Sequence, residues 1–180
     1  MQQEIRLNMT TANLNREEYG SFYQTYIDMC GGHELVEGLT INLDKTKQLF
    51  KSVPIDKQEF RYADGKWTIK EILQHIIDSE RILAYRALRF SRNDSTEVPG
   101  YEHNDYVPES NANKRDYKEL IMEFESVRQS TNLLFKSFDG EILKRTGFAN
   151  KNVISVRALG FIITGHCTHH CQVIRERYLE

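Results

Sequence analysis

The chain has 180 residues and a mass of 21.1 kDa, which is the usual size of a single domain. Hydrophobic residues make up 39% and charged residues 28% of it, values that suit a globular protein and exclude a disordered or fibrous one. Because 24 Lys and Arg nearly balance 26 Asp and Glu, the formal net charge is only −2, and we expect neither nucleic acid nor an anionic membrane as a partner.

The cysteines and the N-terminus both predict a cytoplasmic protein. Three cysteines are an odd number and few for this length, so we expect reduced thiols rather than a disulfide scaffold. The first residues show no basic patch followed by an apolar run, so no signal peptide is predicted. No apolar run approaches the roughly 18 residues of a membrane-spanning helix.

Two parts are predicted along the chain. Residues 1–34 form an N-terminal extension, in which a short helix is possible, and residues 35–180 form the main domain. The first long helix is predicted over about residues 33–52, because an apolar stripe at steps of three and four begins at Leu35. Pro54 follows this stripe, as expected just beyond the end of a helix.

The second long helix, over about residues 68–90, has the clearest start signal. Thr68 and Glu71 have the spacing of a capping box, in which each side chain satisfies a free amide of the first turn. Trp67 and Ile72 have the spacing of a hydrophobic staple, so we assign Trp67 to the helix start rather than to a substrate.

The rest of the chain alternates between irregular and helical patterns. Residues 92–112 predict a loop of about twenty residues, longer than the roughly 12–15 that a compact domain normally tolerates, and such loops often bind ligands. Further helices are predicted over about residues 113–138 and 155–178, and no segment predicts a β-sheet. Four long helices, each with one apolar seam, predict an all-α four-helix bundle.

Histidines on the apolar seams are the main indication of chemistry. His166 and His170 are one turn apart on one face of the last helix, which is a spacing that can hold one metal ion. Their alternative role is that of buried histidines hydrogen-bonded to neighbours. His75 lies at the edge of the seam of the second helix, with the small Ser79 one turn further on. Three histidines with an open fourth position are typical of a catalytic rather than a structural zinc site.

Other readings of the same segment fit less well. His169 could pair with His166, but it lies off the seam, so we expect it beside the metal or at the surface. Cys167 and Cys171 point about 100° away from the histidine pair, which disfavours a Cys₂His₂ site and favours packing against a neighbouring helix. A zincin motif would need a glutamate where Cys167 stands. The Glu-x-x-His pairs of di-iron bundles are also missing.

At these residues the chain resembles the DinB-like, or YfiT-like, superfamily of metal-dependent helical proteins. The resemblance covers residues from about 35 to 180. The blocks that carry it are GKWTIKEILQHIIDSE (65–80), PGYEHNDYV (99–107), SVRAL (155–159), GHCTHH (165–170) and QVIRERY (172–178).

The resemblance implies an up-down-down-up helix order and one divalent metal ion, zinc or nickel, held by His75, His166 and His170. It implies a homodimer for many members. It also implies, for some members, transfer of a low-molecular-weight thiol of the bacillithiol type to an electrophile. Related members use mycothiol in an isomerase.

We therefore expect a metal-dependent enzyme with a small-molecule substrate, most simply a thiol S-transferase. A hydrolase of the same fold and a non-catalytic metal-binding stress-response protein are the alternatives. A fourth protein ligand, such as His103 or Asp105, would favour the non-catalytic reading. Asp105 is a candidate for orienting a water or a ligand histidine. Further candidate residues for the pocket wall are Tyr101, Tyr106 and Arg177.

Overall fold

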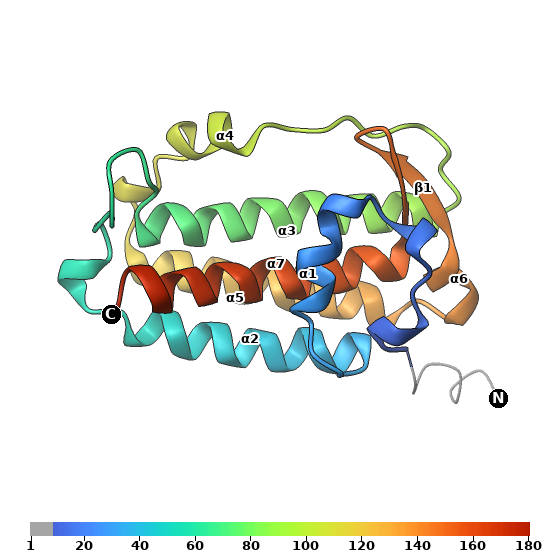
Figure 1. Cartoon of the computed structure of the whole chain (residues 1–180), viewed down its shortest axis with the longest axis horizontal. Helices are drawn as coiled ribbons and strands as arrows, with labels where there is room; N and C mark the ends of the chain where they lie inside the picture. The colour runs from blue at the N-terminus through green and yellow to red at the C-terminus, as the bar shows by residue number, and fades with distance from the viewer. Residues whose placement is uncertain (1–8) are drawn as a thin grey trace.

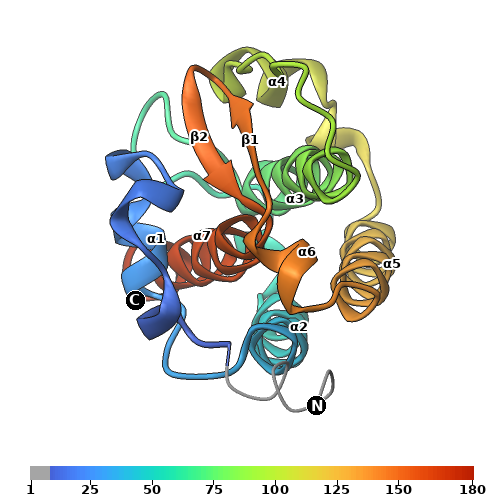
Figure 2. The same cartoon turned by 90° about the vertical axis from the view of Figure 1, so that its right-hand side faces the viewer.

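The computed structural model describes residues 9–180. Four long helices form a bundle: α2 (Leu35–Ser52), α3 (Ile69–Ser91), α5 (Tyr117–Lys136) and α7 (Val156–Arg177). Helices α3 and α2 each pack against both α5 and α7, so α3 and α2 stand at opposite corners (Figure 2). Helices α2 and α7 run in one direction and α3 and α5 in the other, which confirms the up-down-down-up order (Figure 1).

Side-chain caps determine where the long helices begin. The hydroxyl of Thr68 accepts a hydrogen bond from the Glu71 amide at 3.1 Å, and the Glu71 carboxylate accepts one from the Thr68 amide at 2.7 Å, so the predicted capping box is present. Helix α5 begins at Tyr117 rather than near residue 113. The reason is Asp116, whose carboxylate accepts hydrogen bonds from two amides of the first turn.

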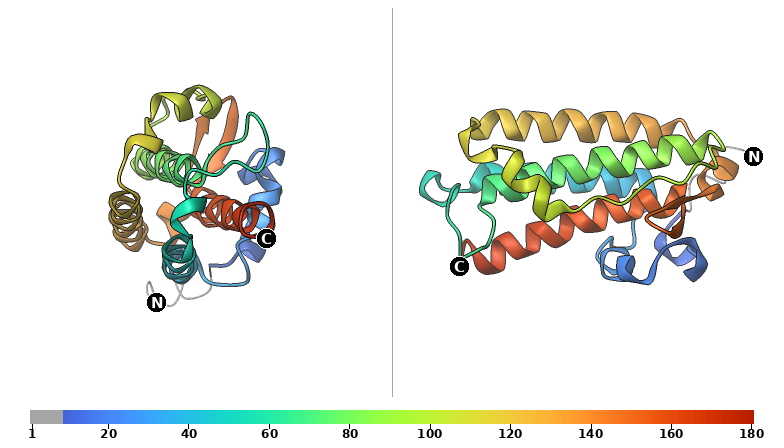
Figure 3. Two further views of the ribbon diagram at one scale, coloured as in Figure 1. Left: turned by 90° about the vertical axis from the view of Figure 1, so that its left-hand side faces the viewer. Right: turned by 90° about the horizontal axis from the view of Figure 1, so that it is seen from above.

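The connection between α3 and α5 must return along the whole bundle, because the two helices run in the same direction. It passes over α3, as Figure 3 shows from above. The prediction of an irregular loop is wrong over part of this segment, since His103–Glu109 forms α4 and Ala112–Lys114 forms a 3₁₀ turn. The Glu102 side chain caps α4 by accepting a hydrogen bond from the Asn104 amide.

The expectation of no β-structure is also wrong. After α6 (Gly140–Lys144), strands β1 (Thr146–Ala149) and β2 (Asn152–Ser155) form an antiparallel hairpin. Asn150 and Lys151, in its turn, both have positive φ, as a two-residue type I′ turn requires. The hairpin packs over one end of α3 (Figure 2). The absence of a side chain at Gly147 allows this close packing, because a Cβ atom there would clash with the Phe90 ring.

The N-terminal segment packs onto the bundle. It consists of the 3₁₀ turns Thr11–Asn13, Arg16–Glu18 and Ser21–Tyr23, followed by the short helix α1 (Gln24–Asp28), and it crosses α7 (Figure 1). Ile27 is buried in one apolar cluster with residues of α2 and α7. Residues 1–8 of the predicted extension lie outside the described residues.

The core has two apolar clusters with buried polar groups between them. Along α3, Ile77 belongs to one cluster and Leu83 to the other, while Glu80 lies between them. The Glu80 carboxylate accepts two hydrogen bonds of 2.8 Å from the Arg128 guanidinium, which also donates to Asn42. Within residues 9–180, no helix has both the length and the apolar character that a membrane crossing requires.

Candidate metal centre

Three imidazoles converge between α3 and α7. The Nε2 atom of His166 lies 2.9 Å from Nε2 of His75 and 3.1 Å from Nε2 of His170. All three ligand atoms lie within 4.8 Å of one another. His75 and His166 are buried and His170 is half-buried. The convergence follows from the fold, because α3 packs along α7 and the residues at i and i+4 of α7 share one face.

Burial keeps these imidazoles neutral. It lowers the pKa of His75 to about 4, with a smaller contribution from His103. The pKa values of His166 and His170 lie well below the usual range, chiefly because of burial and also because of the neighbouring imidazoles. All three rings therefore have a free nitrogen lone pair at neutral pH, which is the form that binds metal ions.

The arrangement fits a divalent cation. Two neutral imidazole nitrogens in contact need one N–H between them, yet Nε2 of His166 takes part in two such contacts. Nitrogens that bind one zinc ion at about 2.0–2.1 Å lie roughly 2.9–3.4 Å apart, which matches the two shorter separations. A cation bound at His166 would take up the lone pairs in both contacts, and the His75 and His170 nitrogens, which lie within 4.8 Å of each other, would share it once they came within about 4.2 Å.

A chain of hydroxyl groups positions His75. Its Nδ1 lies 3.5 Å from the Ser79 hydroxyl, which is 2.8 Å from the Tyr101 hydroxyl. When Nδ1 carries the proton and donates it to Ser79, Nε2 is left with its lone pair facing the other histidines. Ser79, which the sequence suggested only as a small neighbour, therefore orients one of the three candidate metal ligands.

A cavity of about 650 Å³ opens beside the three histidines. Its wall comes from the N-terminal segment, α3, α7, the chain between Gly100 and His103, and the hairpin turn at Asn150. This volume lies within the range of roughly 300–1,000 Å³ that is typical of small-molecule sites.

Two aromatic residues contribute to this wall in ways that the sequence did not indicate. The ring centre of Trp67 is 4.8 Å from that of His75, so Trp67 lines the cavity in addition to standing before the helix. The Tyr26 ring stands perpendicular to His166 with ring centres 5.2 Å apart. The aromatic run of Phe22, Tyr23 and Tyr26 was the available signal, but nothing local connects it with α7.

The other predicted site residues divide into two groups. His169 and Tyr101 line the cavity, and His169 contacts Tyr26 and His170 through its ring. Asp105, Tyr106 and Arg177 do not line the cavity within residues 9–180.

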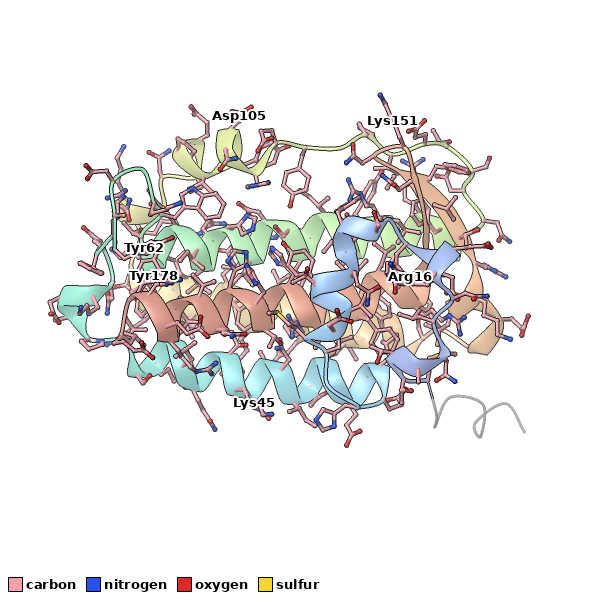
Figure 4. All side chains as sticks on the ribbon, in the orientation of Figure 1. Arg16, Lys45, Tyr62, Asp105, Lys151 and Tyr178 are labelled. Carbon is pink, nitrogen blue, oxygen red and sulfur yellow. The ribbon has the colours of Figure 1, made fainter. Side chains whose placement is uncertain are left out.

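These three positions differ from the prediction for geometric reasons. Asp105 is exposed on the outer side of α4 (Figure 4), because it is two residues from His103 and so points roughly 200° away around the helix. Tyr106 is exposed, and its ring contacts that of Tyr101. Arg177 is exposed in the last turn of α7.

The cysteines face away from the histidines, toward α2. The thiols of Cys167 and Cys171 lie 3.2 Å and 3.5 Å from the Thr46 hydroxyl, and both residues are buried. A Cys₂His₂ arrangement is therefore not formed.

Comparison with known proteins agrees with this architecture. A family model described as the DinB superfamily matches residues 39–174. The structure of YfiT from Bacillus subtilis, described as a probable metal-dependent hydrolase with an unusual four-helix bundle topology, aligns with a TM-score of 0.67 and 18% identity, over 91% of this chain and 90% of that one. The mycothiol-dependent maleylpyruvate isomerase aligns with a TM-score of 0.66 and 9% identity, over 91% of this chain and 62% of that one. No curated protein sequence matches significantly.

Proposed function

Because this chain belongs to the DinB superfamily and brings three histidines together, we propose that it is a divalent-metal-dependent enzyme that acts on a small molecule. The observation that carries the proposal is the pair of Nε2 separations of 2.9 Å and 3.1 Å at the wall of a 650 Å³ cavity. The specific reaction that we propose is transfer of a low-molecular-weight thiol of the bacillithiol type. The mycothiol dependence of a structural neighbour supports a thiol as cosubstrate.

His75, His166 and His170 would hold the metal ion, zinc or nickel. When bound, such an ion supplies Lewis-acid chemistry, which lowers the pKa of a coordinated thiol or water toward neutrality. The protein contributes three neutral imidazoles, one of which is oriented by the Ser79 hydroxyl. Trp67 and Tyr26 cover the cluster with aromatic rings and limit its contact with water.

The proposed transfer breaks two bonds, S–H and the bond from carbon to the leaving group, and forms two, C–S and the bond from the proton to its acceptor. The thiol loses its proton, its sulfur forms a bond to an electrophilic carbon, and a leaving group departs from that carbon with its electron pair. The candidate acceptor of the proton is the His169 imidazole, because it lines the cavity and burial lowers its pKa, which keeps it unprotonated at neutral pH.

A metal-dependent hydrolase is the second candidate, in which water replaces the thiol. The description of YfiT as a probable metal-dependent hydrolase supports it.

A non-catalytic metal-binding protein would be expected to complete the coordination with a fourth side chain. Within residues 9–180 the ligand cluster contains only the three histidines, and its remaining side faces the cavity, which favours an enzyme.

Metal content tests the proposal. Protein made without a polyhistidine tag and without immobilised-metal purification should contain close to one divalent ion per chain by mass spectrometry. His75→Ala, His166→Ala and His170→Ala should lose it. His169→Ala and His33→Ala, in which an exposed histidine is removed, should keep it. Low metal content that none of these substitutions changes would refute the metalloenzyme.

Paired assays separate the two reactions. Wild-type protein and His166→Ala should be incubated with low-molecular-weight thiols and an electrophilic alkyl halide, and separately with activated esters. A transferase consumes thiol and halide in equal amounts, whereas a hydrolase acts only on the esters.

A further inference from the structure

Arg86 is a buried cation without a counter-charge. Its side chain is 2% exposed, and one guanidinium nitrogen donates a 2.9 Å hydrogen bond to the Pro99 carbonyl. Its Nε has no hydrogen-bond partner, and no carboxylate in the described part of the chain forms an ion pair with it. The fully buried Arg128, in contrast, is paired with Glu80 through two hydrogen bonds. An unpaired buried charge costs several kcal/mol, so the environment of Arg86 lacks an anion.

Arg86 lines the same cavity as the three histidines. It follows His75 by eleven residues on α3, which corresponds to roughly 16 Å along the helix axis. Tyr23 and Tyr101 flank it: burial raises the pKa of both phenols, and the charge of Arg86 opposes that rise. The guanidinium and the Tyr23 hydroxyl therefore form a donor-rich end of the cavity, and the Tyr101 hydroxyl, 2.8 Å from that of Ser79, lies between this end and the histidines.

We propose that Arg86 binds a carboxylate group of the substrate or thiol cosubstrate, so that the ligand spans the cavity from this end to the histidines. The proposal rests on the proposed function and adds the substrate class. In the described wall of the cavity Arg86 is the one lysine or arginine, which suits a singly charged carboxylate better than a phosphate dianion. The planar guanidinium also matches a carboxylate in geometry.

Calorimetric titration with three probes of equal chain length tests the proposal. The probes are octanoate, octyl phosphate and neutral octanamide, added to the full chain as purified and after removal of metal by a chelator. Trp67, which is the only tryptophan, gives a second readout by fluorescence. Hydrogen bonds to a charged group contribute about 1.5–3 kcal/mol, so octanoate should bind at least about tenfold more tightly than octanamide.

Substitutions assign the preference to Arg86. Arg86→Met should abolish it, and Arg86→Lys should retain part of it. Arg89→Met is the matched control, since Arg89 is on the same helix and already paired with Asp94, and it should leave the preference unchanged. Arg86→Met should also remain folded, because it removes an unpaired charge.

Several results would overturn the proposal. The first is equal binding of octanoate and octanamide, and the second is tighter binding of octyl phosphate than of octanoate. The third is a preference for octanoate that survives in Arg86→Met. If Arg86→Met also loses much stability while its selectivity is unchanged, Arg86 only anchors the Pro99 carbonyl. The preference should be the same with and without metal. Failure of the metalloenzyme proposal would thus leave it intact, and its own failure would leave the metal centre untouched.

Discussion

At the scale of single residues, the Glu80–Arg128 pair is a buried ion pair within the core. Both side chains are buried, and the guanidinium is fully enclosed. Removing one partner of such a pair leaves an uncompensated charge and typically costs about 3–5 kcal/mol.

We therefore expect Glu80→Gln to lower the free energy of unfolding, measured with urea, by about 3–5 kcal/mol. Glu123→Gln is the control, because Glu123 pairs with Arg81 and Arg115 near the surface, where such pairs contribute at most about 1 kcal/mol. Equal losses in the two variants would contradict this expectation.

His75 makes the stability of the metal-free protein depend on pH. Its pKa in the folded state is about 4, against 6.5 ordinarily, so between these values the unfolded chain binds more protons than the folded one. Above about pH 6.5 the ring is neutral in both states, and its burial does not reduce the free energy of unfolding. As the pH falls from 6.5 toward 4, the free energy of unfolding decreases by up to about 3 kcal/mol.

Urea unfolding of chelator-treated protein at pH 7.5, 5.5 and 4.5 measures this effect. The wild type should lose more stability on acidification than His75→Gln, which lacks the titrating ring. Parallel losses in both proteins would show that His75 does not contribute.

At the scale of elements, the close crossing of α1 over α7 forms one wall of the site. A Cβ atom on Gly165 would lie 1.8 Å from the backbone carbonyl oxygen of Tyr26. Backbone atoms cannot move aside as a flexible side chain can, so this glycine is what allows Tyr26 to reach the neighbouring His166.

Gly165→Ala should accordingly displace the N-terminal segment and cost about 1–3 kcal/mol, although alanine in a helix is ordinarily about 1 kcal/mol better than glycine. Gly38→Ala in α2 is the matched control, since its nearest contact would be an ordinary 3.6 Å, and it should be neutral or stabilising. Urea unfolding measures both variants. Limited proteolysis of the N-terminal segment should be faster only in Gly165→Ala.

At the scale of the whole molecule, the return of the chain along α3 places the candidate site. Because α3 and α5 run in the same direction, residues 92–116 must travel the length of the bundle, and they deliver Tyr101 and His103 to the cavity beside α7. The N-terminal segment adds Phe22, Tyr23 and Tyr26 to the wall of the same cavity. The cavity thus combines pieces of chain from residue 22 to residue 170.

Association of two copies stays a prediction that comes from the family resemblance. Sedimentation velocity of the full chain over a range of concentrations measures it. A homodimer should sediment at twice the 21.1 kDa of the chain, and a species that stays at 21.1 kDa throughout would contradict the prediction.

The sequence alone determined the helical architecture and the histidine pair. Helical period, the capping box at Thr68 and the spacing of His166 and His170 are local properties, because a helix places residues i and i+4 on one face whatever surrounds it. The blocks around His75 and His166 also led to the family, through their resemblance to it.

Tertiary structure alone decided what surrounds those histidines. The approach of Tyr26 to His166, the contact of Trp67 with the rings of His75 and His103, and the unpaired charge of Arg86 depend on contacts between segments brought together by the fold. No local pattern encodes such contacts, because they arise only when α1, α3 and α7 pack together. For the same reason Asp105 and Arg177, plausible from their motifs, lie outside the cavity.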